Sequence, residues 1–253
     1  ICVNDRPTTA SVNVMLNAFT EDITTPAGTT LNTLNFNYSD ALDNQTAISA
    51  GTYTGGDTST PFSYMAITGT NYSATQGVWQ ISKTSSPNAS TASDWINIPV
   101  SGLSPTNALI FRSDSRVRFV AAENYFGSPG YIVVCLGDNS MPSLADFANN
   151  ATTYNIATPT YGDRGTFSSA WDYFARAISA TVTGVNDAPT ISDDTQTHTA
   201  VNEDVATGDN NGATVLDLFS ASYSDATDNQ GANTANAYEN PGAAITGGGE
   251  EAT

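Results

Sequence analysis

Short runs that are either apolar or loosely alternating between apolar and polar residues follow one another along much of the chain. Each run is rich in aromatic and β-branched side chains, and the clearest are 64–68, 77–82, 94–99, 109–111, 117–120 and 131–136. They recur at short, regular intervals, with Gly, Pro, Asn and Ser between them, as is typical of the strands of an antiparallel β-sandwich. Residues 9–20 and 31–38 predict two earlier strands, and 174–185 predicts a closing one. The pattern therefore predicts an all-β fold.

One stretch breaks this succession of strands. Residues 137–165 are long and mostly polar, and the only regular element expected there is a short helical turn at 143–149. Loops of this length without secondary structure are uncommon inside compact domains. We interpret 137–165 as an insertion in the sandwich.

The chain repeats its opening motifs from residue 185 onward. Val3-Asn4-Asp5-Arg6-Pro7-Thr8 returns as Val185-Asn186-Asp187-Ala188-Pro189-Thr190, and Glu21-Asp22 returns at the same offset as Glu203-Asp204. Tyr38–Gln45 returns as Tyr223–Gln230 at a slightly larger offset, so a three-residue insertion separates the landmarks. The last match pairs 66–69 with 244–247. Landmarks in the same order indicate an internal repeat. We expect one full repeat over 1–184 and a partial second repeat over 185–253.

The strongly acidic charge of the chain limits the classes of partner that it can bind. It carries 25 acidic residues against 7 Lys and Arg, a formal net charge of −18. Such a surface argues against nucleic acid and anionic membranes as partners and fits a protein that binds divalent cations. The bland alternative is that the acidic residues only keep the protein soluble. No apolar run approaches the roughly 18 residues of a membrane span.

Two cysteines leave two interpretations open. Cys2 and Cys135 are compatible with one disulfide in an oxidising compartment. Cys135 lies in the apolar run 131–136, where a buried free thiol is an equally good expectation.

Several motifs together resemble a known family. These are the Val-Asn-Asp-Ala-Pro linker at 185–189, the Glu203-Asp204 pair, the Tyr223-Ser224-Asp225-x-x-Asp228 turn, and a body containing Gly77-x-Trp79-Gln80, Trp95-x-x-Ile98 and the stretch 116–130. The combination is similar to the cadherin-like and VCBS-type tandem repeats of large bacterial surface adhesins. The resemblance covers 3–187 and, for the second copy, 185–247. It implies an Ig/cadherin-like sandwich and a place at the cell surface.

The resemblance and the chemistry of the turns both point to Ca²⁺ between successive repeats. Ca²⁺ takes six to eight oxygen ligands from carboxylates, amides and backbone carbonyls. The candidates for the junction within this chain are Asn186, Asp187, Asp225 and Asp228, with Glu21 or Asp138 from the preceding domain and Glu203 as the counterpart of Glu21. The candidates for an equivalent site before the first repeat are Asn4, Asp5, Asp40 and Asp43. The alternative is that these Asp and Asn side chains only cap their own turns.

Catalytic motifs are missing from the sequence. No nucleophile elbow, phosphate loop, His-Glu-x-x-His or Cys-x-x-Cys spacing occurs, and the single histidine, His198, has no evident nucleophile near it. Trp79 and Trp95 fit either a platform for sugar stacking or the sandwich core, and we favour the core. We expect a protein that is not an enzyme.

The partial repeat suggests how the protein functions. A sandwich without its later strands exposes a sheet edge and half of a core. Either the chain belongs to a longer tandem array, or another subunit completes 185–253 by adding strands, and such a head-to-tail contact generates a filament. We therefore predict a structural subunit of an extracellular filament or adhesin stalk, a homopolymer stiffened by Ca²⁺. The alternatives are a ligand-binding adhesin module for carbohydrate or peptide, with surface glycans as partners, and more remotely a polysaccharide hydrolase.

Overall fold

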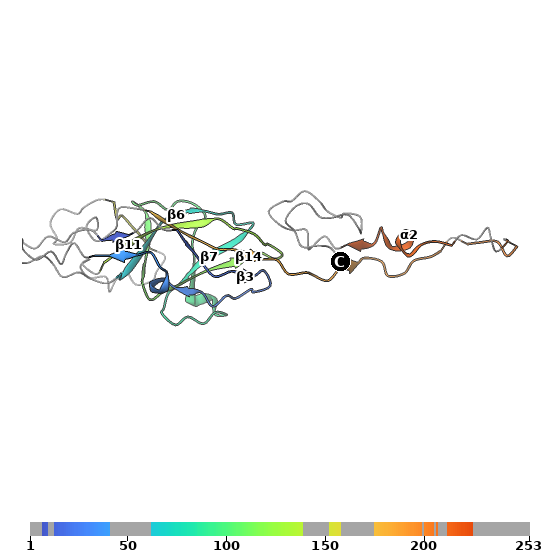
Figure 1. Cartoon of the computed structure of the whole chain (residues 1–253), viewed down its shortest axis with the longest axis horizontal. Helices are drawn as coiled ribbons and strands as arrows, with labels where there is room; N and C mark the ends of the chain where they lie inside the picture. The colour runs from blue at the N-terminus through green and yellow to red at the C-terminus, as the bar shows by residue number, and fades with distance from the viewer. Residues whose placement is uncertain are drawn as a thin grey trace, which may run out of the picture. The chain divides into compact units, whose positions relative to one another are not determined.

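The computed structural model describes residues 7–9, 13–40, 62–138, 152–157, 175–198, 200–204, 206 and 212–224. The chain divides into two compact units, Ile1–Thr183 and Gly184–Thr253. Strands dominate the described ranges, and the only helical elements there are η1 (Leu31–Thr33), η2 (Ala92–Asp94) and α2 (Val215–Phe219). The all-β class expected from the alternating pattern is confirmed (Figure 1). No helix in these ranges has the length and apolar character needed to cross a membrane.

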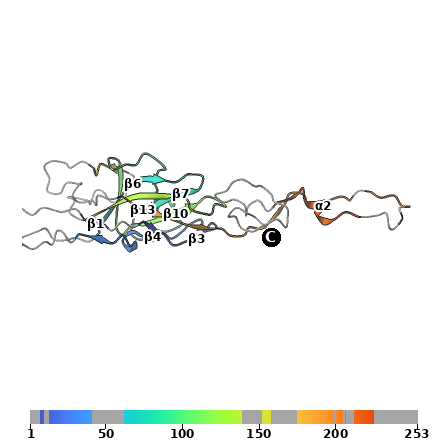
Figure 2. The same cartoon turned by 45° about the horizontal axis from the view of Figure 1, so that its top comes forward.

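The first unit is built on two larger sheets. The six-stranded sheet has the order β12 (Thr153–Tyr154), β9 (Ala108–Arg112), β6 (Tyr64–Asn71), β11 (Tyr131–Gly137), β13 (Arg176–Ser179) and β2 (Val14–Met15). The four-stranded sheet has the order β4 (Thr29–Thr30), β10 (Arg116–Ala121), β7 (Gly77–Ser82) and β8 (Trp95–Asn97). Figure 2 shows strands of both sheets in the body of this unit.

One apolar core joins the two sheets, as in a sandwich. Inward-facing residues of the four-stranded sheet include Trp79 and Phe119, whose ring centroids lie 5.4 Å apart in an edge-to-face arrangement. They belong to the same buried cluster as Met65, Phe111 and Ile132 of the six-stranded sheet. Each is fully buried because successive strand residues point to opposite faces, so every second residue faces the core.

The outer face of the six-stranded sheet is also apolar and is covered locally. Ala66, Ile110 and Cys135 form a second buried cluster there with Ile156, and Tyr154 packs against it. The covering strand β12 therefore comes from the stretch 137–165 that the sequence marked as an insertion. Cys135 is 8% exposed within this cluster. Its predicted pairing with Cys2 lies outside the described residues.

Two strand pairs depart from the antiparallel arrangement that the sequence suggested. β13 pairs in parallel with β2, and β14 (Val182–Thr183) pairs in parallel with β3 (Phe19–Thr20). The reason is that the first and last segments of the unit run side by side in the same direction. The register Ile178↔Val14 is followed by Thr183↔Thr20. The first segment of the chain thus begins beside β13 at one end of the unit. The last segment leaves the unit beyond Thr183, at the opposite end.

The two N-terminal strands expected from the sequence are broken into shorter pieces. Residues 31–38 do not form one strand: β4 ends at Thr30, η1 follows, and β5 (Tyr38–Ser39) comes later. The break occurs because the Leu31 N–H donates to Ser115 O at 2.9 Å, which turns the chain into the sandwich and buries the Leu31 side chain completely. Asn37 has a left-handed φ of 50°, which prevents a continuous strand into β5.

The second unit reproduces the opening strand pair of the first. In the first unit β1 (Thr8–Thr9) pairs with β5 in the register Thr8↔Ser39. In the second unit β15 (Thr190–Ile191) pairs with β16 (Tyr223–Ser224) in the register Thr190↔Ser224. Thr8 corresponds to Thr190 in the sequence repeat, and Ser39 corresponds to Ser224. The repeated sequence therefore forms the same antiparallel pair twice.

A helical turn also recurs before the closing strand of each pair. The helix α2 begins with a capping box, in which the Asp217 N–H donates to Thr214 Oγ1 at 3.0 Å and the Thr214 N–H donates to Asp217 Oδ2 at 3.1 Å. Hydrogen bonding to the Thr214 side chain and to the Thr214 N–H holds the pKa of the Asp217 carboxyl below its usual value. When Tyr38 is aligned with Tyr223, Leu216 corresponds to Leu31, the first residue of η1.

Candidate functional site at the ends of the first unit

The structure describes six of the eleven predicted calcium ligands. Asn4, Asp5, Asp43, Asp225 and Asp228 lie outside the described residues. The six that are described are Glu21, Asp40, Asp138, Asn186, Asp187 and Glu203. Three of these, Glu21, Asp40 and Asp138, are buried in the first unit at 7%, 5% and 0% exposure. Buried carboxylates are uncommon unless they bind a cation or several hydrogen-bond donors, which makes these three the strongest candidates.

Glu21 lies at the end where the chain leaves the first unit. It directly follows β3, and its N–H donates to Thr183 O at 3.1 Å. This hydrogen bond extends the parallel pairing of β3 with β14 by one residue. The parallel pairing thus fixes a buried carboxylate beside the last residue of the unit.

Asp40 and Asp138 lie at the other end. Asp138 follows β11, whose last residue, Gly137, accepts a hydrogen bond from the Ser63 N–H at 2.9 Å. Asp40 follows β5, and the ring of Tyr38 in that strand lies 5.8 Å from the ring of Phe62. The segment around Phe62 and Ser63 therefore links both carboxylates to one end of the sandwich.

The structure separates the two acids that the sequence offered as alternatives for one junction. β11 runs from Tyr131, opposite Ser179, to Gly137, opposite Tyr64, which is about 20 Å at the usual rise of a strand. Glu21 lies beyond the Ser179 end and Asp138 beyond the Gly137 end. Glu21 and Asp138 therefore belong to different ends of the unit.

The second unit places its candidate ligands differently. Glu203 is exposed, although its counterpart Glu21 is buried, and Asn186 is exposed as well. The Asn186 side chain donates from Nδ2 to Asp187 O at 3.2 Å, which is a local backbone contact of the kind that the alternative interpretation expects. Within the described ranges, no three His, Cys, Asp or Glu residues gather into a group that could hold a metal ion. Calcium binding stays a prediction.

A buried arginine that the sequence did not reveal organises the outer face of the four-stranded sheet. Arg118 is 5% exposed and lies with its guanidinium 3.7 Å from the centroid of the Trp95 ring. Its Nε donates to Gln80 Oε1, and its Nη1 donates to Pro26 O and Ala89 O, all at 2.8 Å. Burial lowers the pKa of Arg118. The arginine therefore fastens two loops onto β10.

The structure also locates the two tryptophans that were considered for sugar stacking, Trp79 and Trp95. Trp79 is fully buried in the core between the sheets, as favoured from the sequence. Trp95 is 5% exposed, but it lies outside the core cluster, stacked on Arg118, with its indole N–H donating to Asn88 O at 3.0 Å. Neither ring is exposed as a sugar-stacking platform needs. The alternation of Arg116 and Arg118 with the core residues of β10 is the signal that could have placed an arginine on this face.

Other arginines of the first unit also bind backbone carbonyl groups. Arg176, 4% exposed, donates from Nη2 to Thr9 O at 2.8 Å and to Thr9 Oγ1. Arg116 Nη1 lies 3.4 Å from Ala27 O. Arg118 and Arg176 are thus buried cations that donate hydrogen bonds to backbone carbonyl groups.

No protein-family model, curated protein or solved structure matches this chain. His198, the residue considered for catalysis, is exposed in the second unit. The functional argument therefore rests on the geometry of the two units.

Proposed function

We propose that the chain is a structural subunit of an extracellular filament or adhesin stalk, in which β-sandwich repeats are joined end to end, stiffened by Ca²⁺, and completed by neighbouring subunits. The observation that carries this proposal is the parallel run of the first and last strands of the first unit. The stretch from Arg176 to Thr183 spans about 23 Å when extended, and residues 14–20 run beside it in the same direction. A chain that enters at one end and leaves at the other suits units strung along one axis.

The repeated strand pair supports the same proposal. Shortly after Thr183, at Thr190, the chain begins β15, the counterpart of β1. The described part of the second unit thus has the same opening strand pair as the first unit. An Ig/cadherin-like arrangement of tandem domains fits this order of elements.

The buried acids supply a reason for calcium at the ends. Glu21 lies at one end of the first unit, and Asp40 and Asp138 lie at the other, within a chain of net charge −18. Burying a carboxylate costs free energy that a bound cation offsets. Bound Ca²⁺ would also reduce the repulsion between successive acidic units and stiffen the linker between them.

Calcium titration of the full chain tests this part of the proposal. We expect Ca²⁺ to raise the melting temperature and to protect residues 184–189 from protease, because a ligand at 100 times its Kd stabilises by about 2.7 kcal/mol. Glu21→Gln should reduce both effects. Asp22→Asn is the matched control, since Asp22 is the exposed neighbour of Glu21.

The control also separates site binding from general screening of charge. If Glu21→Gln and Asp22→Asn respond alike, the effect comes from screening and not from a site at Glu21. If Ca²⁺ changes neither melting nor proteolysis of the unmodified chain, the calcium-stiffened stalk is wrong.

A further inference from the structure

The first and last segments of the first unit are hydrogen-bonded to each other and run in the same direction. We call residues 13–21 and 177–183 the terminal seam; within it β2 pairs with β13 and β3 pairs with β14. Three further backbone hydrogen bonds cross the seam. They are Leu16 N–H to Ser179 O at 2.9 Å, Phe19 N–H to Thr181 O at 3.4 Å and Glu21 N–H to Thr183 O at 3.1 Å. The two segments are therefore bonded along the whole seam.

Side-chain groups add polar contacts between the same segments. The Ala177 N–H donates to Asn13 Oδ1 at 3.2 Å, at the end where the seam begins. The Ser179 hydroxyl group lies 3.4 Å from Val14 O and donates to it. These contacts reinforce the part of the seam that lies before Leu16.

Apolar side chains anchor both segments in the core. The core cluster contains Leu16 from the first segment, and Val14 and Phe19 pack against it. The last segment contributes Ile178, Ala180 and Val182 to the same cluster. If one segment slid past the other, these side chains would leave their places in the core, at a cost in free energy that grows with the apolar area exposed.

The parallel direction of the two segments determines how the seam responds to tension. The first segment begins at one end of the unit, and the last segment leaves beyond Thr183 at the opposite end. Tension along the chain therefore pulls 13–21 and 177–183 in opposite directions along their common axis. All hydrogen bonds of the seam are then loaded together in shear. Between antiparallel neighbours the corresponding chain ends lie at the same end of the sheet, and tension there breaks the hydrogen bonds one after another.

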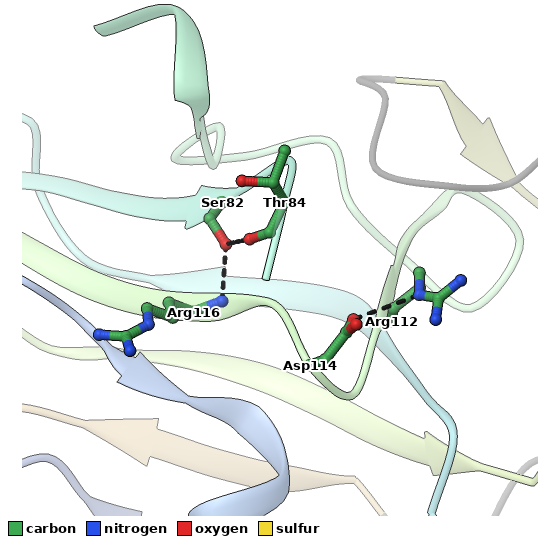
Figure 3. Close-up of polar contacts among 5 residues, drawn as sticks. All are labelled: Ser82, Thr84, Arg112, Asp114 and Arg116. Atoms are coloured by element: carbon green, nitrogen blue, oxygen red, sulfur yellow. Dashed lines mark hydrogen bonds and ion pairs between the residues drawn. The ribbon is translucent and has the colours of Figure 1, made fainter. Parts of the chain in front are cut away.

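Polar contacts elsewhere in the unit lie off this path of tension (Figure 3). Arg112 Nε and Asp114 Oδ1 form an ion pair at 3.2 Å. Ser82 Oγ accepts a hydrogen bond from the Arg116 N–H at 2.7 Å and donates one to Thr84 O at 2.7 Å. These residues lie between the two segments along the chain, whereas the seam joins the first segment directly to the last. They bear the main load only after the seam has opened.

We propose that the terminal seam is a mechanical clamp, which keeps the first unit folded when the chain is under tension. The hydrogen bonds and core side chains of the seam resist that tension together, so the clamp needs neither a partner nor a bound ion. The inference rests on the proposed function for the source of the tension, since a stalk or filament is pulled along its length. The resistance itself is a property of a single chain.

Single-molecule force spectroscopy of the full chain in two pulling directions tests the clamp. Handles at the two ends of the chain load the seam in shear. Handles at the C-terminal end and at Ile23→Cys pull the same seam apart from one end, because Ile23 is 41% exposed and lies just beyond Glu21, which is bonded to Thr183. A chain with Ile23→Cys and Cys2→Ser serves for both directions, so only the position of the handle differs.

The rupture force should depend strongly on the pulling direction. At equal loading rates we expect it to be at least about twice as high in shear, since several bonds must then break together and forced unfolding follows the unfolding rate. Opening of the seam in shear should release the roughly 170 residues from β2 to β14 in one step, about 600 Å of extended chain.

Two buried isoleucines separate mechanical strength from overall stability. Ile178 and Ile67 are both fully buried, but Ile178 belongs to the seam and Ile67 belongs to β6. Ile178→Ala should lower the rupture force in shear by at least about a quarter, because its contacts break on the way to the loaded transition state. Ile67→Ala is the matched control and should change that force by less than about a tenth. Urea unfolding should show that both variants are less stable.

Equal rupture forces in the two directions would overturn the clamp. So would a rupture force that Ile178→Ala leaves unchanged, or one that Ile67→Ala lowers equally. The measurement is made on single chains and is therefore independent of filament formation. Filaments together with equal rupture forces would contradict the clamp alone, whereas strong resistance in shear without filaments would contradict the proposed function and leave the clamp in place.

Discussion

Arg118 shows how a single side chain stabilises this fold in a way that hydrophobic patterning does not reveal. The pattern of β10 places Val117 and Phe119 in the core, but it does not say that the intervening arginine is buried as well. Arg118 becomes buried because the loops that contain Pro26 and Ala89 cover it and accept its hydrogen bonds. Contacts between distant loops of this kind cannot be read from local sequence.

Replacement of Arg118 should be costly. Arg118→Met leaves the carbonyl groups of Pro26 and Ala89 without their charged donor and removes the contact with Trp95, so we expect the free energy of unfolding to fall by about 2–4 kcal/mol. Arg112→Met is the control, because the Arg112–Asp114 pair is exposed and is worth under about 1 kcal/mol. Urea unfolding measures both. Equal small losses would show that the Arg118 cluster does not stabilise the fold.

Tyr72 should make the free energy of unfolding depend on pH in the alkaline range. Burial raises the pKa of the Tyr72 phenol above its ordinary 10.0, and the hydroxyl group donates a hydrogen bond to Ile98 O. A group whose pKa is raised by folding stabilises fully below its unfolded pKa, and this stabilisation is lost as pH rises above that value.

The free energy of unfolding should therefore stay level from about pH 7 to 9 and fall above about pH 10, by up to about 1.4 kcal/mol per pH unit for one proton. Tyr72→Phe should make this fall shallower. Tyr131→Phe, at a 37% exposed position, should not. A pH profile that is unchanged by Tyr72→Phe would contradict the assignment.

At the scale of elements, the sequence predicted the central strands well and the N-terminal ones poorly. The run 77–82 is the strand β7 without change, and 131–136 differs from β11 by one residue. Both strands have a paired strand on each side and bury several apolar residues, so their apolar character is a strong local signal. The stretch 31–38 fails because Leu31 is drawn into the core by the turn at Ser115, a contact between segments far apart in the sequence. For the same reason the sequence did not reveal the parallel pairing of β2 with β13 and of β3 with β14.

The repeated helical turn allows a test with an internal control. Leu31→Ala should lower the free energy of unfolding by about 3–4 kcal/mol, because Leu31 is fully buried. Leu216→Ala should change it by less than about 0.5 kcal/mol, because the counterpart is 52% exposed. Chemical unfolding of both variants measures the difference. Equal losses would show that the second repeat is already covered in the isolated chain.

At the scale of the whole molecule, the sequence showed that the opening motifs recur, but it did not show the path of the chain through the first unit. The duplicated linker and turn residues sufficed to show the recurrence, since the pair of β1 with β5 and the pair of β15 with β16 have the same register. The entry and exit of the chain lie at opposite ends of the first unit because residues 14–20 pair in parallel with 178–183, which no local pattern indicates. The sequence offered Glu21 or Asp138 as alternatives for one junction, and the structure places them at opposite ends of the first unit.

The most direct test of an end-to-end structural polymer is electron microscopy of the native material in Ca²⁺ and in excess chelator. We predict filaments with a regular subunit repeat that fray when Ca²⁺ is removed, because the acidic units then repel one another. Dispersed single particles in both conditions would contradict the account.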